Sequence, residues 1–323
     1  MKNNTVCILG GTGFVGQHLA HRLTRHGYRV TILTRRRERH RELTVNQDIR
    51  LVEADIFDME ALQQALQETA AVINLVGILN ETGGRDNRFV RLHAGLPQHV
   101  AATAAECGVE RLLQMSALNA DINEQHSHYL KTKGAGEDSV HSSAYQGLAV
   151  TSFRPSVIFG PGDSFFNRFA TLLRRTPGVF PLACPKSRFA PVYVGDVAEA
   201  FYLALRDEST YGQHLELCGP EIYTLKQLVE YTRDTLELQR SIIGLGNGLS
   251  KLQAFMLGLV PGKPFSLDNY YSLQHDSVCD HNALPDLGIT PTSIHTIVPG
   301  YLMARNMRGH YNRFRQHSKR GQA

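Results

Sequence analysis

The chain has 323 residues, of which 42% are hydrophobic and 20% are charged, so it can form one large domain or two packed domains and is not a disordered chain. Its net charge is +4, but six basic residues lie in the segment 305–323, which has no acidic residue. Because the rest of the chain is close to neutral, a nucleic-acid binder with a broad basic face is excluded.

Predicted strands and helices alternate along the first part of the chain. Short apolar runs alternate with segments of helical periodicity, a pattern typical of a parallel sheet covered by helices on both faces. The predicted strands are Thr5–Leu9, Arg29–Leu33, Ile49–Glu53, Ala71–Leu75 and Arg111–Met115, and the predicted helices are Phe14–His26, Met59–Gln67 and Leu92–Cys107.

The alternation continues beyond these elements and is lost after Pro220. Further helices are predicted at Tyr129–His141 and Val194–Leu205, a strand at Ala149–Phe153, and the end of another strand near Phe189–Tyr193. We therefore predict an α/β fold with a doubly wound parallel Rossmann sheet and a smaller C-terminal lobe. The predicted domains are 1–160 with 188–219 returning to it, a substrate or partner lobe of 161–187 and 220–300, and a basic tail of 301–323.

The segment 242–262 is the longest weakly charged stretch of the chain. Asn247 and Lys251 interrupt it, so it is not predicted to span a membrane. Apolar residues recur in it at helical spacing, which predicts a helix with one apolar face packed against the main domain. The alternative is a surface for lipid or for a partner protein. The residues of this face are Leu245, Leu249, Leu252, Met256 and Leu259.

The five cysteines are widely separated along the chain. None of the spacings is typical of a metal site or a redox motif, so we expect no metal and predict small, buried, unpaired thiols in a reducing compartment. The first residues enter a predicted strand without a basic leader, and we therefore expect a cytoplasmic protein. The cysteines are Cys7, Cys107, Cys184, Cys218 and Cys279.

A glycine-rich turn follows the first predicted strand and opens the first predicted helix. There Gly10 permits a tight turn, Gly13 lets the backbone approach a pyrophosphate, and Gly16 lets the helix pack closely on the strand. The N-terminus of the helix then faces the anion. The alternative is a glycine turn without a ligand. The predicted dinucleotide-binding residues of this turn are Gly10, Thr12, Gly13, Phe14, Val15 and Gly16.

Arginines stand where an NAD-specific site carries an acidic residue. An Asp or Glu near the end of the second strand would bind the ribose 2′-hydroxyl, but here Thr34 is followed by Arg35 and Arg36. Guanidinium groups bind a 2′-phosphate through charge-assisted hydrogen bonds. The sequence therefore favours NADP(H), with NAD(H) as the weaker alternative, unless the loop is only a solvated basic turn.

Two further strand ends supply candidate cofactor residues. Asp55 and Ile56 follow the third predicted strand, where a carboxylate can accept a hydrogen bond from the adenine amino group. Asp58 is equally suited to capping the next helix. After the fourth strand, Val76 and the small Gly77 would let the backbone pass close to the dinucleotide. The alternative is an ordinary strand end without a ligand.

Tyr129 and Lys133 form a Tyr-x-x-x-Lys pair one turn apart on a predicted helix. We expect the ammonium to lower the pKa of the phenol, so that Tyr129 exchanges a proton with a substrate carbonyl or hydroxyl. Lys133 would also hold the nicotinamide ribose. Ser116 lies just after an apolar strand, 13 residues upstream of Tyr129, and is the candidate donor to a substrate carbonyl.

With these motifs and the string Arg154–Gly160, the chain resembles the extended short-chain dehydrogenases/reductases over about residues 5–220. The strings Met115–Ala120, Tyr129–Glu137 and Pro191–Val197 are similar to the atypical branch that contains the nucleotide-binding accessory subunit of mitochondrial NADH:ubiquinone oxidoreductase (complex I) and its bacterial relatives. The resemblance implies a bound NADP(H), an active site at Tyr129, Lys133 and Ser116, and cofactor contacts at Pro155 and Val157.

One departure from the family concerns Ser116. Many extended relatives have a run of Ser or Thr after the fifth strand, whereas Ala117 and Leu118 follow here. If Ser116 is turned away from the site, Asn119 is the nearest polar substitute.

Three functions remain open from the sequence. The first is an NADP(H)-dependent oxidoreductase or epimerase-like enzyme for a hydrophobic carbonyl or hydroxyl compound, which the family links to quinones. The second is a non-catalytic accessory or assembly subunit that docks on a respiratory complex or, peripherally, on a membrane through 242–262 and the basic tail. The third is a sensor of the NADP(H) ratio.

Overall fold

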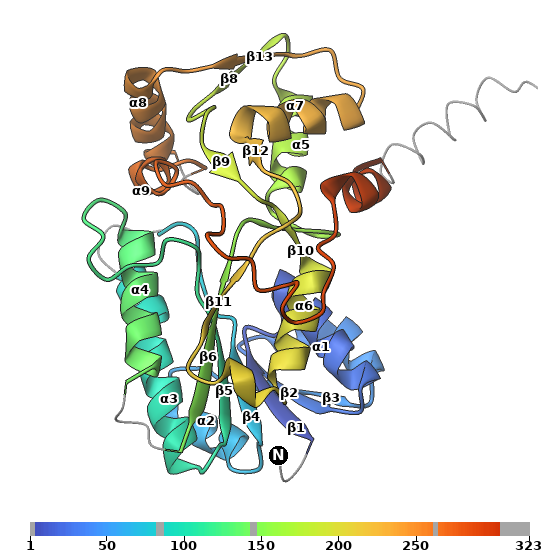
Figure 1. Cartoon of the computed structure of the whole chain (residues 1–323), viewed down its shortest axis with the longest axis vertical. Coiled ribbons are helices and arrows are strands. Elements are labelled where there is room, and N and C mark those ends of the chain that lie inside the picture. Colours follow the sequence, from blue (N-terminus) through green and yellow to red (C-terminus); the bar gives the residue numbers. More distant parts are fainter. Residues whose placement is uncertain (1–3, 82–86, 143–146, 261–263, 304–323) are drawn as a thin grey trace, which may run out of the picture.

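A parallel sheet of seven strands forms the centre of the N-terminal domain (Figure 1). The computed structural model describes residues 4–81, 87–142, 147–260 and 264–303. The strand order is β11-β6-β5-β4-β1-β2-β3 and every neighbouring pair is parallel, which confirms the predicted doubly wound sheet. The strands are β1 (Thr5–Leu9), β2 (Arg29–Thr34), β3 (Ile49–Glu53), β4 (Ala71–Asn74), β5 (Arg111–Met115), β6 (Ala149–Pro155) and β11 (His214–Leu217).

Helices cover both faces of this sheet because both faces are apolar. Side chains alternate along β1, so Ile8 packs on one face and Cys7 and Leu9 on the other. The core around Ile8 also includes residues of α1 (Phe14–Arg25) and α6 (Val194–Ala204). The core around Cys7 includes residues of α2 (Met59–Leu66), α3 (Leu96–Glu106) and α4 (His128–Val140).

The helix predicted over 92–107 begins as a wider turn. Residues Val90–Gly95 form a π-helix, η2, and α3 follows directly from Leu96. Pro97 has no N–H and cannot donate to the carbonyl four residues before it, which belongs to His93. The backbone of α4 also comes so close that a Cβ on Gly136 would lie 1.7 Å from the His93 carbonyl oxygen. This irregular turn therefore fixes His93 beside α4.

A second core lies in the smaller C-terminal lobe, at the top of Figure 1. Phe166, Leu228 and Val298 are buried in it, the last from a helix at 294–303. β8 pairs with β13 in parallel and β9 pairs with β12 in antiparallel orientation. The remaining elements are η1 (Arg37–Val45), β7 (Ile158–Phe159), α5 (Phe166–Arg175), β8 (Val179–Leu182), β9 (Arg188–Phe189), β10 (Val192–Tyr193), η3 (Glu208–Thr210), β12 (Tyr223–Thr224), α7 (Leu225–Thr235), β13 (Ser241–Gly244), α8 (Asn247–Gly258) and α9 (Leu267–Ser272).

The chain crosses between the first domain and the lobe at more places than the sequence predicted. β9 lies within the expected return segment 188–219, yet it pairs with β12 of the lobe. Conversely, Leu284 and Ile289 lie in the predicted lobe segment but are buried in the core around Ile8 of the first domain. The backbone N–H of Ala283 donates to the Glu216 carbonyl at the end of β11, which fixes this second return.

The prediction that all cysteines are unpaired is wrong for two of them. Cys218 and Cys279 form a disulfide across a sequence separation of 61 residues. Cys218 follows β11, and the chain that returns from the lobe to the first domain brings Cys279 beside it. Sequence spacing carries no information about such a contact. Cys7 and Cys184 are buried free thiols and Cys107 is a partly buried one.

The prediction that the apolar face of segment 242–262 is packed against the main domain is also wrong. The helix exists as α8, but Leu249, Leu252, Met256 and Leu259 are each more than half exposed. The helix is anchored by its other side, where Ser250 and Ala254 are buried. None of the described helices is long and apolar enough to cross a membrane.

Candidate nucleotide-binding and active site

The glycine-rich turn lies at the carboxyl end of β1, beside the end of β4. Gly10 has φ of +78°, and a Cβ on it would lie 3.1–3.3 Å from the backbone of Leu75 and Val76. A Cβ on Gly16 would lie 2.5 Å from the Gly10 carbonyl oxygen, so only glycine lets α1 approach the turn this closely. Chain connections leave this edge in opposite directions after β1 and β4, the usual place for a dinucleotide in such sheets.

The first turn of α1 is suited to an anion. Gly13 is its N-cap residue, and within the described residues no side chain caps the helix. Its first turn holds no acidic residue, so the N–H groups and the positive end of the helix dipole meet no fixed negative charge there. Thr12, Phe14 and Val15 surround this helix start, and the predicted fit of a pyrophosphate is sterically and electrostatically sound.

The loop after β2 carries Arg35 and Arg36, and both side chains are exposed. Glu53, the last residue of β3, lies opposite Thr34 in the sheet and accepts a hydrogen bond of 2.9 Å from the Arg37 N–H. Sequence reasoning missed Glu53 as a neighbour of this loop. Its position at the end of a predicted strand could have indicated the contact, because neighbouring parallel strands end at the same edge of a sheet. The arginines thus share the loop with one carboxylate.

Asp55 and Asp58 have distinct local roles after β3. Asp58 caps α2 by accepting from the N–H groups of Glu60 and Ala61, which supports the capping alternative for this residue. Asp55 is exposed and accepts from the Phe57 N–H at 3.1 Å, beside the partly buried Ile56. Val76 donates its N–H to Asn74 at the end of β4.

Tyr129 and Lys133 meet two further residues in one cluster. A Cβ on Gly77 would lie 3.2 Å from the Lys133 Nζ and 3.6 Å from the His93 Nε2. The rings of His93 and Tyr129 lie 5.5 Å apart at nearly right angles. Lys133 Nζ donates to the Met115 carbonyl at 3.0 Å. The structure therefore brings the predicted Tyr-Lys pair to the predicted passage of the dinucleotide at Gly77.

His93 is a buried, neutral member of this cluster that sequence reasoning missed. Its Nε2 accepts from the Ile78 N–H at 3.1 Å, so the ring proton lies on Nδ1, which faces the Thr132 hydroxyl at 3.1 Å. Burial, with the nearby Lys133 charge, lowers the pKa of His93 to about 2. Its position inside a predicted apolar helix did not indicate that it belongs to this cluster.

Burial also changes the acid–base properties of the Tyr-Lys pair. It lowers the pKa of Lys133 to about 8, against the smaller opposing effect of Glu137. The pKa of Tyr129 is raised to about 12, by burial first and then by the Asp268 carboxylate. The expectation that Lys133 lowers the phenol pKa is therefore wrong, because desolvation and Asp268 dominate. At neutral pH, Tyr129 is a proton donor.

Ser116 is not directed at this cluster. Its hydroxyl donates to the buried Glu137 carboxylate at 3.0 Å, and Glu137 also accepts from Arg154 and His214. The substitute, Asn119, is exposed and its amide donates to the Asp276 carbonyl. The structure thus brings Tyr129 and Lys133 together, while both candidate hydroxyl or amide donors are bonded elsewhere.

Pro155 and Val157 lie at the end of β6, where the domain meets the lobe. The Pro155 carbonyl accepts from the Leu118 N–H at 3.3 Å, and the Val157 carbonyl accepts from the Val192 N–H at 3.0 Å. Both residues therefore stand at the same carboxyl edge of the sheet as the glycine turn.

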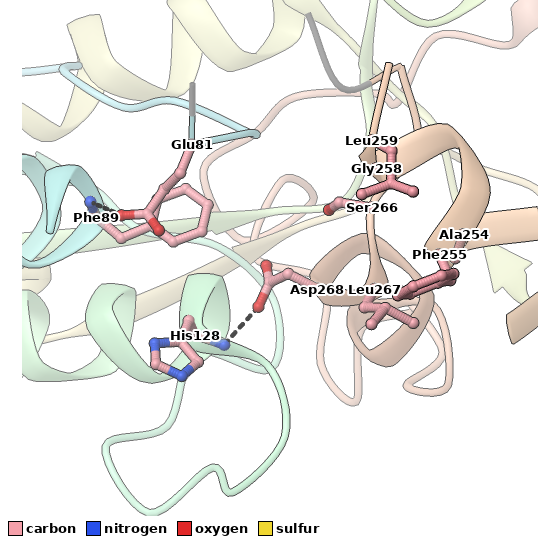
Figure 2. Close-up of a pocket in the computed structure, with 10 residues that line it drawn as sticks. All are labelled: Glu81, Phe89, His128, Ala254, Phe255, Gly258, Leu259, Ser266, Leu267 and Asp268. Carbon is pink, nitrogen blue, oxygen red and sulfur yellow. Dashed lines mark hydrogen bonds between the residues drawn. The ribbon is translucent and has the colours of Figure 1, made fainter. Parts of the chain in front are cut away.

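A cavity of about 360 Å³ lies between the first domain and the lobe, and two of its lining residues, Phe89 and Asp268, contact Tyr129 (Figure 2). Phe89 lines it and lies 6.0 Å from the Tyr129 ring. Asp268 of α9 also lines it and accepts from the N–H groups of His128 and Tyr129, so the lobe holds the start of α4. Figure 2 shows Phe255 and Leu259 of α8 on the opposite side from Phe89. The apolar part of the wall is formed by Phe89, Ala254, Phe255, Leu259 and Leu267, and the polar part by Glu81, His128, Ser266 and Asp268.

No metal centre accompanies this site in the described part of the chain, where no group of three His, Cys, Asp or Glu side chains is placed to hold an ion. Tyr129, whose raised pKa keeps the phenol protonated, thus contacts residues that line the cavity.

The chain is similar in sequence to several known proteins. The chain is 31% identical over 300 residues to the NADH dehydrogenase [ubiquinone] 1 alpha subcomplex subunit 9, mitochondrial, of Mus musculus, with 89% of this chain and 76% of that protein covered. It is 32% identical over 197 residues to ceramide reductase of Caulobacter vibrioides, which covers 60% of this chain and 58% of that protein.

Solved structures share the fold at low sequence identity. The structure of MoeE5 in complex with UDP-glucose and NAD superposes with a TM-score of 0.72 at 17% identity, covering 94% of this chain and 99% of that chain. The sequence profile described as the NAD dependent epimerase/dehydratase family matches residues 6–218. The chain therefore belongs to the NAD dependent epimerase/dehydratase family.

Proposed function

We propose that the protein is an NADP(H)-dependent oxidoreductase or epimerase-like enzyme that acts on a hydrophobic carbonyl or hydroxyl compound. The observation that carries the proposal is the cavity beside Tyr129, whose walls include Phe89, Phe255 and Leu259. Such walls bind an apolar substrate, and Tyr129, which contacts the lining residues Phe89 and Asp268, would supply proton transfer together with Lys133. One relative is named ceramide reductase, which supports a reduction of a compound with apolar chains, and we include quinone-related compounds among the candidates.

The residues present fit the dinucleotide. The glycine turn and the start of α1 would hold the pyrophosphate, Arg35 and Arg36 a 2′-phosphate, and Asp55 with Ile56 the adenine end. Pro155 and Val157, with Val76 and Gly77, would border its nicotinamide end. When bound, the nicotinamide supplies or accepts a hydride.

Tyr129 would donate a proton to the substrate carbonyl oxygen, since its raised pKa keeps the phenol protonated. Lys133 would place its ammonium between the phenol and the ribose hydroxyls near Gly77. Ser116 is the family's candidate for a second donor. Because Glu137 holds its hydroxyl, we propose that Tyr129 alone polarises the carbonyl.

The pH dependence of this reaction follows from Lys133. We expect kcat/KM for reduction to fall as the pH rises through about 8, because the Lys133 ammonium then loses its proton. Initial rates of NADPH oxidation across this range measure it. The Lys133→Met variant should lack this fall, and an identical fall in that variant would assign the titration to another group.

The preference for NADPH is tested at the loop after β2. We expect Arg35→Asp combined with Arg36→Ala to weaken NADPH binding about 10- to 100-fold while NADH binding changes little, because only the 2′-phosphate meets the guanidinium groups. Calorimetry with both cofactors measures this. Arg39→Ala removes another exposed arginine of η1 and is the matched control. Equal weakening for both cofactors would refute the proposed role.

The second candidate function is an accessory subunit of a respiratory NADH:quinone oxidoreductase, in which the cofactor stabilises the fold. The relatives named as NADH dehydrogenase or NADH-ubiquinone oxidoreductase subunits favour it, since they match most of the chain. Such a subunit would be cytoplasmic and peripheral, and would dock through 242–262 and the basic tail, which beyond residue 303 lies outside the described residues.

Native mass spectrometry of the purified protein separates the two functions. A nucleotide that exchanges readily on dialysis, together with turnover of long-chain ketones or quinones, supports the enzyme. A retained nucleotide without turnover supports the accessory subunit or a sensor of the NADP(H) ratio.

A further inference from the structure

The helix α8 presents an apolar surface at the outer edge of the lobe (Figure 1). Leu252, Met256 and Leu259 follow one another at spacings of four and three residues, so they share one face of the helix. Their exposed fractions are 52%, 60% and 74%. Soluble proteins expose single apolar side chains often, but a contiguous group of this kind marks a contact surface. We call the following residues the α8 face: Leu249, Leu252, Phe255, Met256, Leu259 and Val260.

Buried contacts on the opposite side of α8 fix the orientation of the α8 face. On the opposite side of the helix, the Ser250 hydroxyl accepts from the Cys184 N–H at 3.1 Å. Ala254 is fully buried against Ala183, Cys184 and Tyr270. These contacts orient the helix and direct the α8 face away from the lobe core.

The surroundings of the α8 face favour a negatively charged partner surface. From Ser241 to Leu267 the chain contains no Asp or Glu, and the carboxylate of the next residue, Asp268, accepts from the N–H groups of His128 and Tyr129. Lys251 is exposed on α8, with its ammonium 5.5 Å from the Tyr271 ring centre. An apolar helix face with a lysine and no acidic residue on the same helix is typical of helices that lie in the interface of an anionic bilayer.

The cavity beside Tyr129 supports a bilayer over a protein partner. Phe255 and Leu259 line the cavity and are also 54% and 74% exposed, so the apolar wall continues from the cavity to the α8 face. A protein seated on the α8 face would cover this continuation. A bilayer would instead bring compounds with apolar chains to the cavity, which is the proposed substrate site.

We propose that the α8 face docks on the surface of an anionic lipid bilayer. Its apolar side chains enter the boundary between headgroups and acyl chains, and Lys251 stays among the headgroups. The docking goes beyond the proposed reaction and does not depend on turnover.

Vesicle flotation of the full chain tests the proposal, with vesicles of phosphatidylcholine and phosphatidylglycerol. We expect the wild type to float with these vesicles, and the double variant Leu252→Glu, Met256→Glu to bind them at least about 100-fold more weakly, because two large apolar side chains no longer enter the bilayer. Neither residue lines the cavity, so nucleotide binding and thermal unfolding should stay unchanged.

The matched control adds the same charge elsewhere on the surface. Val45 and Ile222 are exposed apolar residues outside α8, and Val45→Glu with Ile222→Glu should leave vesicle binding within about twofold of the wild type. Equal loss in both double variants would show that net charge alone governs binding, and it would overturn the proposal.

Two further outcomes would overturn it. Retained binding by the Leu252→Glu, Met256→Glu variant would assign the membrane contact to another segment, such as the basic tail. The other outcome is a wild type that does not bind vesicles and is a dimer by light scattering, while the double variant is a monomer. A second copy of this chain would then be the partner that covers the α8 face. Turnover enters none of these readouts, so failure of the proposed reaction leaves the test intact.

Discussion

Tyr129→Phe is expected to lower kcat/KM for carbonyl reduction by about 10²- to 10⁴-fold while nucleotide affinity stays unchanged. The loss is the usual contribution of a positioned general acid, and phenylalanine keeps the ring that packs against Phe89 and His93. NADPH oxidation with a long-chain ketone measures turnover, and calorimetry measures binding of the nucleotide.

A tyrosine outside the site provides the control for this variant. Tyr202 lies on α6, where its ring stacks on His26, and Tyr202→Phe should keep full activity. If Tyr129→Phe also retained full activity, Tyr129 would have no part in the chemistry, and the accessory-subunit function would become the better supported one.

The parts of the site that sequence predicted well depend on local rules. The placement of Gly10 and Gly16 follows from a turn between a strand and a helix, and that geometry is encoded within seven consecutive residues. The pairing of Tyr129 with Lys133 follows from the period of a single helix. Both features would be the same in any chain that folds these short segments in this way.

The parts that sequence missed depend on contacts between distant segments. His93 joins the site because Pro97 and Gly136 shape the turn in which it lies, and Asp268 reaches Tyr129 from the lobe 139 residues further along the chain. The raised pKa of Tyr129 could not be foreseen for the same reason, since burial and Asp268 determine it. Helical spacing likewise identified the apolar face of α8 but not its exposure, which depends on what the rest of the chain covers.

Ser116 illustrates how a buried charge can remove a residue from its expected role. Its hydroxyl is one of three groups that donate to the Glu137 carboxylate, together with Arg154 and His214. Glu137 is 1% exposed, so its carboxylate cannot turn to water. A serine that donates to a buried carboxylate is therefore held more strongly by that carboxylate than by a transient substrate carbonyl.

Glu137→Ala is expected to lower the free energy of unfolding by about 3 kcal/mol at neutral pH. The variant leaves Arg154 without its counter-charge and removes the hydrogen-bond partner of His214 and of the buried Ser116 hydroxyl. The value is at the low end for a broken buried pair, because the Arg154 side chain is 28% exposed and can partly rehydrate. Chemical unfolding followed by circular dichroism measures it. Asp138→Ala removes the neighbouring exposed carboxylate and should change stability by less than about 0.5 kcal/mol.

The pH dependence of this difference tests its electrostatic origin. Burial raises the pKa of Glu137, but hydrogen bonds from His214 and Arg154 outweigh burial and leave the pKa below its usual value. A carboxylate with a lowered pKa stabilises the fold above the unfolded-state value, about 4.3, and this contribution is lost as the pH falls through the folded-state pKa. The difference between the wild type and Glu137→Ala should therefore begin to shrink as the pH falls through the unfolded-state value, about 4.3, and continue to shrink through the lower folded-state pKa. A difference that stays constant into acid would mean that Glu137 acts through packing and not through its charge, and the confinement of Ser116 would then need another cause.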